Sequence, residues 1–362
     1  GYFGVEEQYN DLLSGIKQKV VIPLDPYELQ EIPTAPAGAS LVLTIDREIQ
    51  RTVEKILDNA VAKNKAQNGT IIVMNPKNGE ILAMASTPHL DPNAYWEYEK
   101  IFTAGVSYNM AVNQIYEPGS VFKIITMASA LDAGVVNWDT PFNDTGVIEV
   151  GGWPIYNWDR GAWGAQNMIG CMQHSLNVCL SWVALQLGPD QFYDYLNRFG
   201  IGHRTNIDLA GEEVYPLSIP GDPTWYSINL ATNSFGQGVA VTPIQMIMAA
   251  SAMANDGKMV APHVLHSYIQ NGQQYYTNPQ IVGTPIKAET AEVLTEMLAI
   301  SLEEEASDAL VEGYRVAGKT GTAEVGPSGE LDENGDPINL EDAWFAGFAP
   351  SDKPQLAVCV MI

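Results

Sequence analysis

The stretch Glu117-Pro118-Gly119-Ser120-Val121-Phe122-Lys123 decides the fold, because a turn there enters a helix that is apolar almost all round. Such a helix is expected to be buried. Ser120 and Lys123 are three positions apart, so their side chains share one face, and the helix N-terminus offers positive potential and free N–H groups. To accept a proton near pH 7, Lys123 needs a pKa well below ~10.4, which burial can provide. Alone, the pattern also fits a capping serine beside a solvated lysine.

Two further short motifs have the residue types that nucleophilic catalysis uses. His174-Ser175-Leu176-Asn177 lies between two apolar segments and would present a hydroxyl and an amide at a helix junction. Lys319-Thr320-Gly321-Thr322 follows a β-rich run, and the glycines on either side of Lys319-Thr320 let another backbone approach the strand closely. This predicts an edge strand to which an extended peptide adds as a further strand.

Working outward, the chain is mostly helical in its middle and strand-like at both ends. Apolar positions after Asp46 recur at helical spacing, and Asn78-Gly79 supplies the tight turn of a hairpin. The predicted strands are Ser40–Ile45, Thr70–Met74, Glu80–Ala85, Tyr314–Glu324, Trp344–Ala349 and Leu356–Met361, and two clear helices run from Pro243 to Ala254 and from Ala288 to Ser301. This order predicts an α+β fold, an α/β sandwich. Its antiparallel sheet is built from both termini, with helices on its faces and a mostly helical subdomain.

Tryptophans and cysteines gather in the central region. Asp144 to Gly164 is rich in Gly and Trp and is predicted to form a hairpin or flap, whose tryptophans we expect to fill structure rather than stack on a sugar. Cys171 and Cys179 would lie roughly 12 Å apart along a continuous helix. We therefore expect these two, and Cys359, to be small buried side chains without a disulfide.

Composition limits the classes of function. The 362 residues, 46% of them hydrophobic, suffice for one large domain with a smaller piece attached, here 39–362 and 1–38. A net charge of -25 opposes binding to nucleic acid. The longest apolar stretches are shorter than the ~18 to 20 residues that cross a bilayer. The start at Gly1 and the apolar run ending at Ile362 suggest a piece of a longer chain.

The three motifs together are the known signature of penicillin-binding proteins and serine β-lactamases. The chain resembles the class B penicillin-binding proteins over nearly its whole length and is expected to have their transpeptidase fold. The other matching stretches are Gly4-Val5-Glu6, Leu41 to Asp46, Gly79 to Met84, Gly236-Gln237-Gly238, Thr242 to Gln245, Ala254 to Gly257 and Trp344 to Pro350. By this resemblance, residues 1–38 are the end of a pedestal and 39–362 are the penicillin-binding transpeptidase domain.

The resemblance also implies a reaction. Ser120 would attack the penultimate D-Ala carbonyl of a peptidoglycan stem peptide, expel D-alanine and pass the acyl group to a neighbouring stem. β-Lactams would trap the same serine. Lys123 would activate Ser120, Ser175 would relay or orient protons, and Asn177 would hold Lys123 and the substrate amide.

The Lys-Thr-Gly strand would complete this site. Lys319 would help the proton relay, and with Thr320 and Thr322 it would bind the terminal carboxylate beside Gly321. The N–H groups of Ser120 and Thr322 would form the oxyanion hole. No metal or organic cofactor is needed. The implied partners are stem peptides, β-lactams and a membrane glycosyltransferase, at the outer face of the bacterial cytoplasmic membrane.

Some positions depart from the family, and two other functions stay open. Met110 stands where the family often has Arg, and the helix that usually ends the domain is not in this sequence. A serine β-lactamase would need a second base for water, but the chain has no Glu-x-x-Leu-Asn element and has Asn177 where one class has Val. A β-lactam sensor is disfavoured by the pedestal-like start. A Gly-x-Ser-x-Gly hydrolase is excluded by the missing motif.

Overall fold

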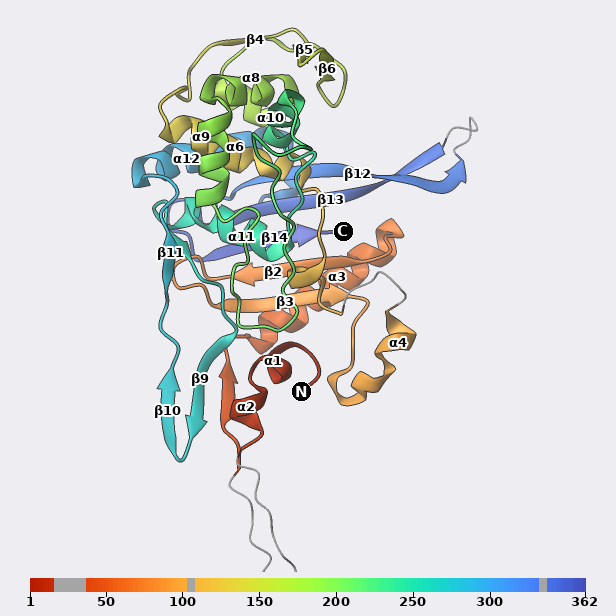
Figure 1. Cartoon of the computed structure of the whole chain (residues 1–362), viewed down its shortest axis with the longest axis vertical. Helices are drawn as coiled ribbons and strands as arrows, with labels where there is room; N and C mark the ends of the chain where they lie inside the picture. The colour runs from red at the N-terminus through yellow and green to blue at the C-terminus, as the bar shows by residue number, and fades with distance from the viewer. Residues whose placement is uncertain (16–36, 103–107, 332–336) are drawn as a thin grey trace, which may run out of the picture.

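The computed structural model describes residues 1–15, 37–102, 108–331 and 337–362, and its centre is a five-stranded antiparallel sheet. The strand order is β12-β13-β14-β2-β3. These strands are β2 Gly69–Met74, β3 Ile81–Thr87, β12 Ala317–Leu331, β13 Pro337–Ala349 and β14 Leu356–Met361. The last of them, β14, pairs with β2, with Val358 opposite Val73, so the two ends of the chain meet in one sheet (Figure 1). The α+β prediction is confirmed.

Helices pack on both faces of this sheet because successive residues of β2 point to opposite sides. Ile71 and Val73 face α3 Arg47–Asn64, which Asp46 caps by accepting the N–H groups of Glu48 and Ile49. Ile72 and Met74 belong to the main core, on the side of α11 Pro243–Ser251. Both helices start where the sequence predicts.

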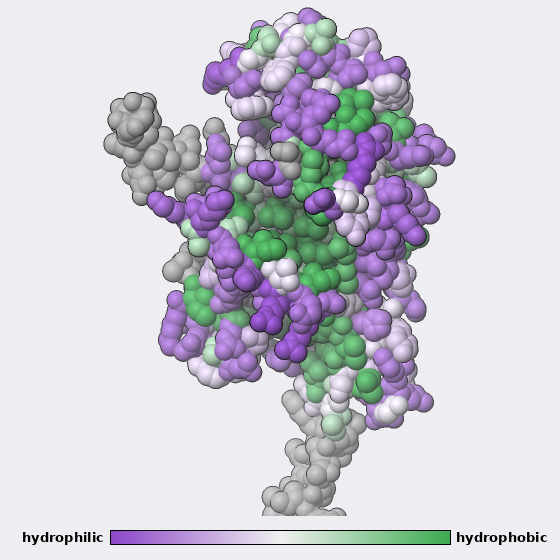
Figure 2. All heavy atoms as spheres, turned by 180° about the vertical axis from the view of Figure 1, so that it is seen from behind, coloured by the Kyte–Doolittle hydropathy of each residue, from purple (hydrophilic) through white to green (hydrophobic). Residues whose placement is uncertain are grey.

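The rear face of the sheet is only partly covered. On that side α3 packs against β2 and β3, with Val358 and Val360 of β14 at the edge of its small core. Seen from behind, an apolar surface lies across the middle of the molecule (Figure 2). Phe345 pairs with Val360 in the register of β13 and β14, and both are half-buried.

Above the sheet in Figure 1 lies a helical subdomain. Its helices are α6 Lys123–Asp132, α7 Met168–Gln173, α8 Asn177–Leu187, α9 Pro189–Arg198, α10 Ser227–Ser234 and α12 Ala288–Glu305. Residues Lys123 to Ala130 are all buried, as the apolar pattern predicts. The remaining short elements are α1 Gly4–Gln8, α2 Asn10–Leu13, η2 Pro92–Glu97, α4 Tyr98–Ile101, α5 Met110–Asn113, η3 Gly119–Phe122, η4 Met253–Asn255, η5 Ser307–Ala309, β8 Met259–Val260 and β11 Ile281–Gly283.

The Trp-rich stretch forms the predicted flap. It consists of the hairpin of β5 Val147–Val150 and β6 Trp153–Tyr156, framed by the paired strands β4 Phe142–Asp144 and β7 Gly164–Gln166. Trp153 is 66% exposed and Trp158 is 70% exposed. The expectation that the flap's tryptophans fill structure is wrong for these two. The apolar contacts of the hairpin are made by Val150 and Ile155 instead.

Cys171 and Cys179 form a disulfide, with their Cα atoms 6.0 Å apart, so the expectation of separate thiols is wrong. That expectation assumed one continuous helix. Instead α7 ends at Gln173 and α8 begins at Asn177, and Ser175 between them has a φ of 54°. This left-handed residue reverses the chain and brings the two cysteines together. Cys359 is free and buried, as expected.

Removing this disulfide is expected to lower the free energy of unfolding by roughly 2 to 3 kcal/mol, because it closes a loop of about nine residues in the unfolded chain. The change is Cys171→Ala with Cys179→Ala, and the measurement is urea unfolding. Cys359→Ala controls for the loss of a buried sulfur. Equal unfolding midpoints for oxidised and dithiothreitol-treated wild-type protein would contradict the prediction.

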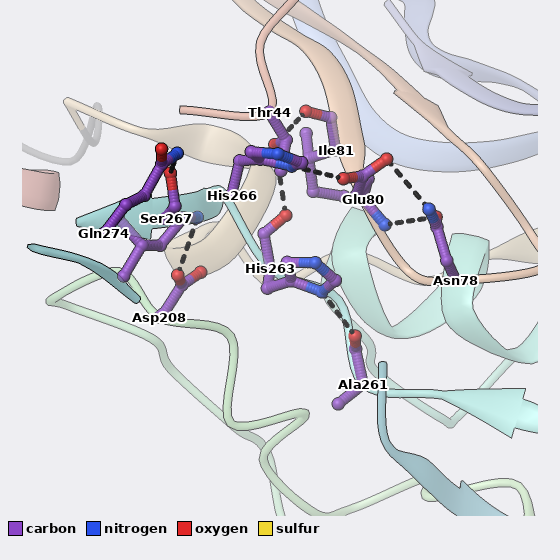
Figure 3. A network of polar contacts seen from close by, with 11 residues as sticks. Thr44, Asn78, Glu80, Ile81, Asp208, Ala261, His263, His266, Ser267 and Gln274 are labelled. Carbon is purple, nitrogen blue, oxygen red and sulfur yellow. Dashed lines mark hydrogen bonds and ion pairs between the residues drawn. The ribbon is translucent and has the colours of Figure 1, made fainter. Parts of the chain in front are cut away.

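A second, smaller sheet connects the N-terminal segment to the later part of the chain and was not predicted as a unit. It consists of β1 Ser40–Leu43, β9 Leu265–Gln270 and β10 Gln273–Tyr276. Figure 3 shows the polar contacts at its base. His266 lies 3.0 Å from a Glu80 carboxylate oxygen, and the Asp208 carboxylate accepts the N–H groups of Val264 and Leu265.

Asp208 also accepts the hydroxyl of Tyr9, which ties α1 and α2 to this sheet. Residues 16–36 of the predicted linker lie outside the described residues, and the predicted boundary at residue 38 stays a prediction. Among the helices in the described ranges, none is both long and apolar enough to cross a bilayer.

Candidate active site

Ser120 lies in the 3-10 turn η3, which runs directly into α6. In a 3-10 turn, side chains three positions apart are eclipsed, so the Ser120 and Lys123 side chains leave the chain on the same side. Gly119 has a φ of 54°, and its N–H donates to the carbonyl of Gly236. A Cβ at Gly119 would collide with the carbonyl oxygen of Thr322. The turn that carries Ser120 is therefore in backbone contact with β12.

A second glycine makes the same contact from the strand side. A Cβ on Gly321 would lie 3.0 Å from the backbone nitrogen of Ser120 and 2.8 Å from that of Val121. Gly321 thus brings β12 against the N–H groups at the start of the turn. The close backbone approach predicted for this strand is made to the turn that carries Ser120.

Lys123 is fully buried, and its amino group meets the turn between α7 and α8. The Lys123 Nζ lies 2.6 Å from the carbonyl oxygen of Ser175, 3.0 Å from Ser175 Oγ and 2.8 Å from Asn177 Oδ1. The left-handed conformation of Ser175 directs both of its oxygens to this one nitrogen. Three oxygens of the α7–α8 turn, from two residues more than fifty positions after Lys123, therefore surround a single amine.

Burial, and then the charge of Lys319, hold the pKa of Lys123 well below its ordinary value. A neutral amine has two hydrogens and one lone pair. In the structure the Lys123 Nζ is the donor to all three oxygens, for which a charged ammonium has three hydrogens. The neutral amine that the lowered pKa favours keeps two of these hydrogen bonds, and its lone pair is then free to take a proton from a nucleophile.

Lys319 lies on β12 with its side chain buried, and burial lowers its pKa to about 8 although the Glu305 carboxylate acts in the opposite direction. Its Nζ donates to the carbonyl of Thr320 at 3.0 Å. Thr320 and Thr322 alternate with Lys319 along the strand and are exposed. The strand therefore combines a buried amino group with two accessible hydroxyls.

Other contacts beside Asn177 come from residues that the sequence analysis did not single out. The Asn177 Nδ2 donates to the carbonyl of Tyr156 at 3.2 Å, and the N–H of Val178 donates to Asn157 Oδ1 at 3.1 Å. The flap is thereby fastened to the start of α8. The Trp-rich composition marks the segment, but no local pattern shows that it folds onto a helix about twenty residues later.

His174 is held beside Ser175 from two sides. Its ring stacks on Trp163 with centroids 3.9 Å apart, and its Nδ1 lies 2.9 Å from a Glu305 carboxylate oxygen. The Trp158 indole donates to the His174 carbonyl at 3.3 Å. These contacts agree with a structural role for His174, and the sequence analysis gave this histidine no catalytic role.

The arrangement can perform acyl transfer through a covalent intermediate. It places a serine at a tight turn, a buried amine of lowered pKa three residues later, and an edge strand with a second lysine alongside. In the ranges that the structure describes, no group of three or more His, Cys, Asp or Glu side chains is placed to hold a metal ion.

Comparison with known proteins agrees with this site. Residues 69–362 match the family model of the penicillin binding protein transpeptidase domain. All of the chain aligns with stage V sporulation protein D of Bacillus subtilis at 36% identity, covering 56% of that protein. It also aligns over its whole length with the peptidoglycan D,D-transpeptidase FtsI of Escherichia coli K12 at 31% identity, covering 59% of that protein.

Solved structures give the same result. The crystal structure of penicillin binding protein 3 from Mycobacterium tuberculosis in complex with ampicillin superposes with a TM-score of 0.85 at 28% identity, over 100% of this chain and 78% of the other. The chain spans little more than half the length of the two curated relatives above. On its family match, sequence identity and shared fold, this chain belongs to the penicillin-binding protein transpeptidase family, and the predicted resemblance to its class B members is confirmed.

Proposed function

We propose that this chain is the catalytic part of a peptidoglycan D,D-transpeptidase. Two relatives support this proposal, because their names include this activity. They are the FtsI protein above and a Pseudomonas aeruginosa protein at 32% identity. The observation that carries the proposal is the buried Lys123 amine. Lys123 follows Ser120 by three positions, and its Nζ lies within hydrogen-bonding distance of Ser175 and Asn177.

In the proposed reaction, Ser120 Oγ attacks the carbonyl carbon of the penultimate D-Ala, and its proton passes to the neutral Lys123 amine. The tetrahedral intermediate collapses and expels D-alanine, whose nitrogen takes up the proton through Lys123 and Ser175. An amine of a neighbouring stem then attacks the acyl-enzyme and gives its proton to Lys123, and this proton passes to Ser120 Oγ as its bond to the acyl carbon breaks, which restores the free serine. Asn177 keeps Lys123 in place throughout, since its Oδ1 lies 2.8 Å from the Lys123 Nζ.

The strand β12 supplies substrate binding in this proposal. The cationic Lys319 and the hydroxyls of Thr320 and Thr322 bind the terminal carboxylate, and Gly321 leaves room for the approach of the Ser120 turn. The N–H groups of Ser120 and Thr322 receive the oxyanion, where one such donor typically contributes roughly 3 to 4 kcal/mol to transition-state stabilisation.

The rate of acylation by benzylpenicillin is expected to fall as the pH rises through about 8, because Lys319 then loses the charge that attracts the drug's carboxylate. Below that pH the amine is protonated and binds. If only the charged form reacts, the second-order rate constant falls about tenfold for each further pH unit. Quenched-flow mass spectrometry from pH 6 to 10 measures it. Lys319→Arg stays charged throughout, so its profile is expected to be flat, and a fall of equal steepness in this variant would contradict the assignment.

Two other functions of the same acyl-enzyme chemistry are separated by one experiment. Intact-protein mass is followed for hours after addition of benzylpenicillin, and D-alanine release from a stem pentapeptide is assayed in parallel. A lasting adduct together with D-alanine release supports the transpeptidase. An adduct that disappears while the drug is turned over indicates a β-lactamase, and a lasting adduct without D-alanine release indicates a β-lactam sensor. No adduct from folded protein would overturn the whole proposal.

The remaining assignments concern the larger protein. We propose that residues 1–38 end a pedestal and that 39–362 are the catalytic domain, acting at the outer face of the bacterial cytoplasmic membrane with a membrane glycosyltransferase as partner. The Cys171–Cys179 disulfide supports the location, since such bonds persist in oxidising, extracytoplasmic compartments.

A further inference from the structure

A tight turn at the end of the flap presents an aromatic and a cationic side chain beside Asn177. The turn runs from Asn157 to Arg160, and the Arg160 N–H donates to the carbonyl of Asn157 at 3.0 Å. Trp158 and Arg160 are exposed, and Arg160 has a φ of 55°. A non-glycine residue with that backbone is strained and persists only where its surroundings enforce it.

The enforcing group is Asn157, which is buried. Its Nδ2 donates to Asp144 Oδ2 at 2.8 Å and to the carbonyl of Gly161 at 3.1 Å, and its Oδ1 accepts the N–H of Val178. Asp144 is buried too and also accepts the N–H of Trp163. The turn is thus rigid and is fixed to the first residues of α8.

The Arg160 charge is available to a ligand. Its guanidinium carbon lies 5.0 Å from the centre of the Tyr156 ring, and among the described residues no carboxylate forms an ion pair with it. The neighbouring Asp159 is held by other groups, because it accepts the N–H of Gly161 at 2.9 Å and the Trp163 indole at 3.1 Å. The chain as a whole has a net charge of -25 and repels anions. An arginine without a carboxylate partner gives this turn a local positive potential that attracts an anion.

This cation is connected to Asn177 through Tyr156, whose ring it covers and whose carbonyl Asn177 binds. Asn177 binds Lys123 through its Oδ1 and the Tyr156 carbonyl through its Nδ2, so it stands between the proposed base and the flap. In the proposed reaction, a stem peptide whose end is held on β12 with its penultimate carbonyl at Ser120 would continue past Asn177. Its upstream residues would then reach Tyr156, whose carbonyl Asn177 binds and whose ring lies under the Arg160 guanidinium.

We propose that Tyr156, Trp158 and Arg160 form a subsite for the upstream part of the donor stem peptide, in which Arg160 pairs with a free carboxylate of that peptide. The aromatic rings lie along its aliphatic part, and the guanidinium forms a charge-assisted hydrogen bond to the carboxylate. This inference rests on the proposed transpeptidase function and adds a preference for stems that carry a free carboxylate upstream of the D-Ala-D-Ala end.

The test compares two synthetic stem peptides that both end in D-Ala-D-Ala. One has a free side carboxylate upstream and the other has a carboxamide at the same position. We expect the wild-type KM for D-alanine release to be about threefold to tenfold lower for the carboxylate, the range for a partly exposed charge-assisted contact. Arg160→Gln is expected to raise the carboxylate KM to the carboxamide value, with kcat changed much less than KM.

Two further variants guard the interpretation. Arg160→Gly suits the positive φ, so it keeps the turn even if Arg160→Gln distorts it, and it is expected to lose the same preference. Arg198→Gln is the control, because Arg198 also lies over a tyrosine ring, 4.8 Å from that of Tyr195 on α9, but is paired with Asp194 and lies on another element of the helical subdomain. It is expected to keep the wild-type preference.

The outcomes separate this inference from the function on which it rests. Wild-type protein that releases no D-alanine contradicts the proposed function. Wild-type release with no preference, or a preference that persists in Arg160→Gln, overturns the subsite alone. So does an Arg160→Gln effect seen only when the stem is attached to its disaccharide, since the turn would then bind glycan. A benzylpenicillin adduct on Arg160→Gln shows that its Ser120 site is folded.

Discussion

Replacing Ser120 by alanine is expected to abolish the covalent adduct with benzylpenicillin. The wild-type chain should gain the mass of one drug molecule, located on the peptide that contains Ser120, because this oxygen sits at the turn between Lys123 and β12. Without the oxygen no acyl bond forms, whatever the affinity for the drug. The measurement is intact mass after prolonged incubation, followed by peptide mapping. The effect is a complete loss, which is the largest that any single change here should produce.

Ser175→Ala is the matched control for this experiment. It removes the serine oxygen that lies 3.0 Å from the Lys123 amine but leaves Ser120 in place, so it should still form the adduct on the Ser120 peptide, only more slowly. Thermal unfolding of Ser120→Ala should stay close to wild type, since substitutions at partly exposed positions usually change stability by about 0.5 kcal/mol or less. An adduct on another residue of Ser120→Ala would contradict the assignment of the nucleophile.

Much of the fold was predictable because its elements carry strong local patterns. The helix α3 begins with an aspartate cap, and α11 begins with Thr242 as cap and Pro243 at its first position. The hairpin of β2 and β3 turns at Asn78-Gly79, where Gly79 has a φ of 83°. Period-two and period-3.6 patterns act over a few residues, so they can be recognised without knowing the remainder of the chain.

The errors came where a distant or unusual local conformation decides the structure. The 12 Å expected between Cys171 and Cys179 held only for a continuous helix, and one left-handed residue, Ser175, breaks it. Trp158 was expected to fill structure, yet it is exposed because the turn after β6 is fixed by the buried Asn157 beneath it. Neither the left-handed conformation of Ser175 nor the exposure of Trp158 is indicated by the residues next to it in the sequence.

The candidate site divides in the same way. The three motifs contain its candidate residues, but the sequence does not show which of these residues contact one another. Lys123 meets Ser175 and Asn177 across 52 and 54 positions of the chain, and these contacts make it a buried amine with three partners. The proposed role of Lys123 as a base implies a low pKa, and this could be said from the sequence. The burial that lowers the pKa is seen only in the packing of α6 against the α7–α8 turn.

Replacing Lys123 by alanine is expected to slow acylation by benzylpenicillin by 10²- to 10⁴-fold, the usual contribution of a positioned base. The variant loses the proton acceptor for Ser120 and leaves Asn177 Oδ1 and the Ser175 carbonyl without their partner. Lys123→Arg separates the two effects. Its guanidinium stays protonated at all accessible pH values, so it can donate hydrogen bonds but cannot act as a base, and it should be about as slow as alanine.

Lys123 should also affect how the free energy of unfolding depends on pH. This measurement tests whether its pKa is lowered in the folded protein, which the acylation rate alone does not show. The folded-state pKa of Lys123 is lowered by burial, so the folded protein binds fewer protons than the unfolded chain at pH values between that pKa and ~10.4. Raising the pH in this range therefore favours the folded state, by at most about 1.4 kcal/mol per pH unit for one such group. Urea unfolding at several pH values should show a smaller rise for Lys123→Ala than for wild type. An identical rise, or acylation within tenfold of wild type, would mean that Lys123 is not the neutral base and that another group takes the proton from Ser120.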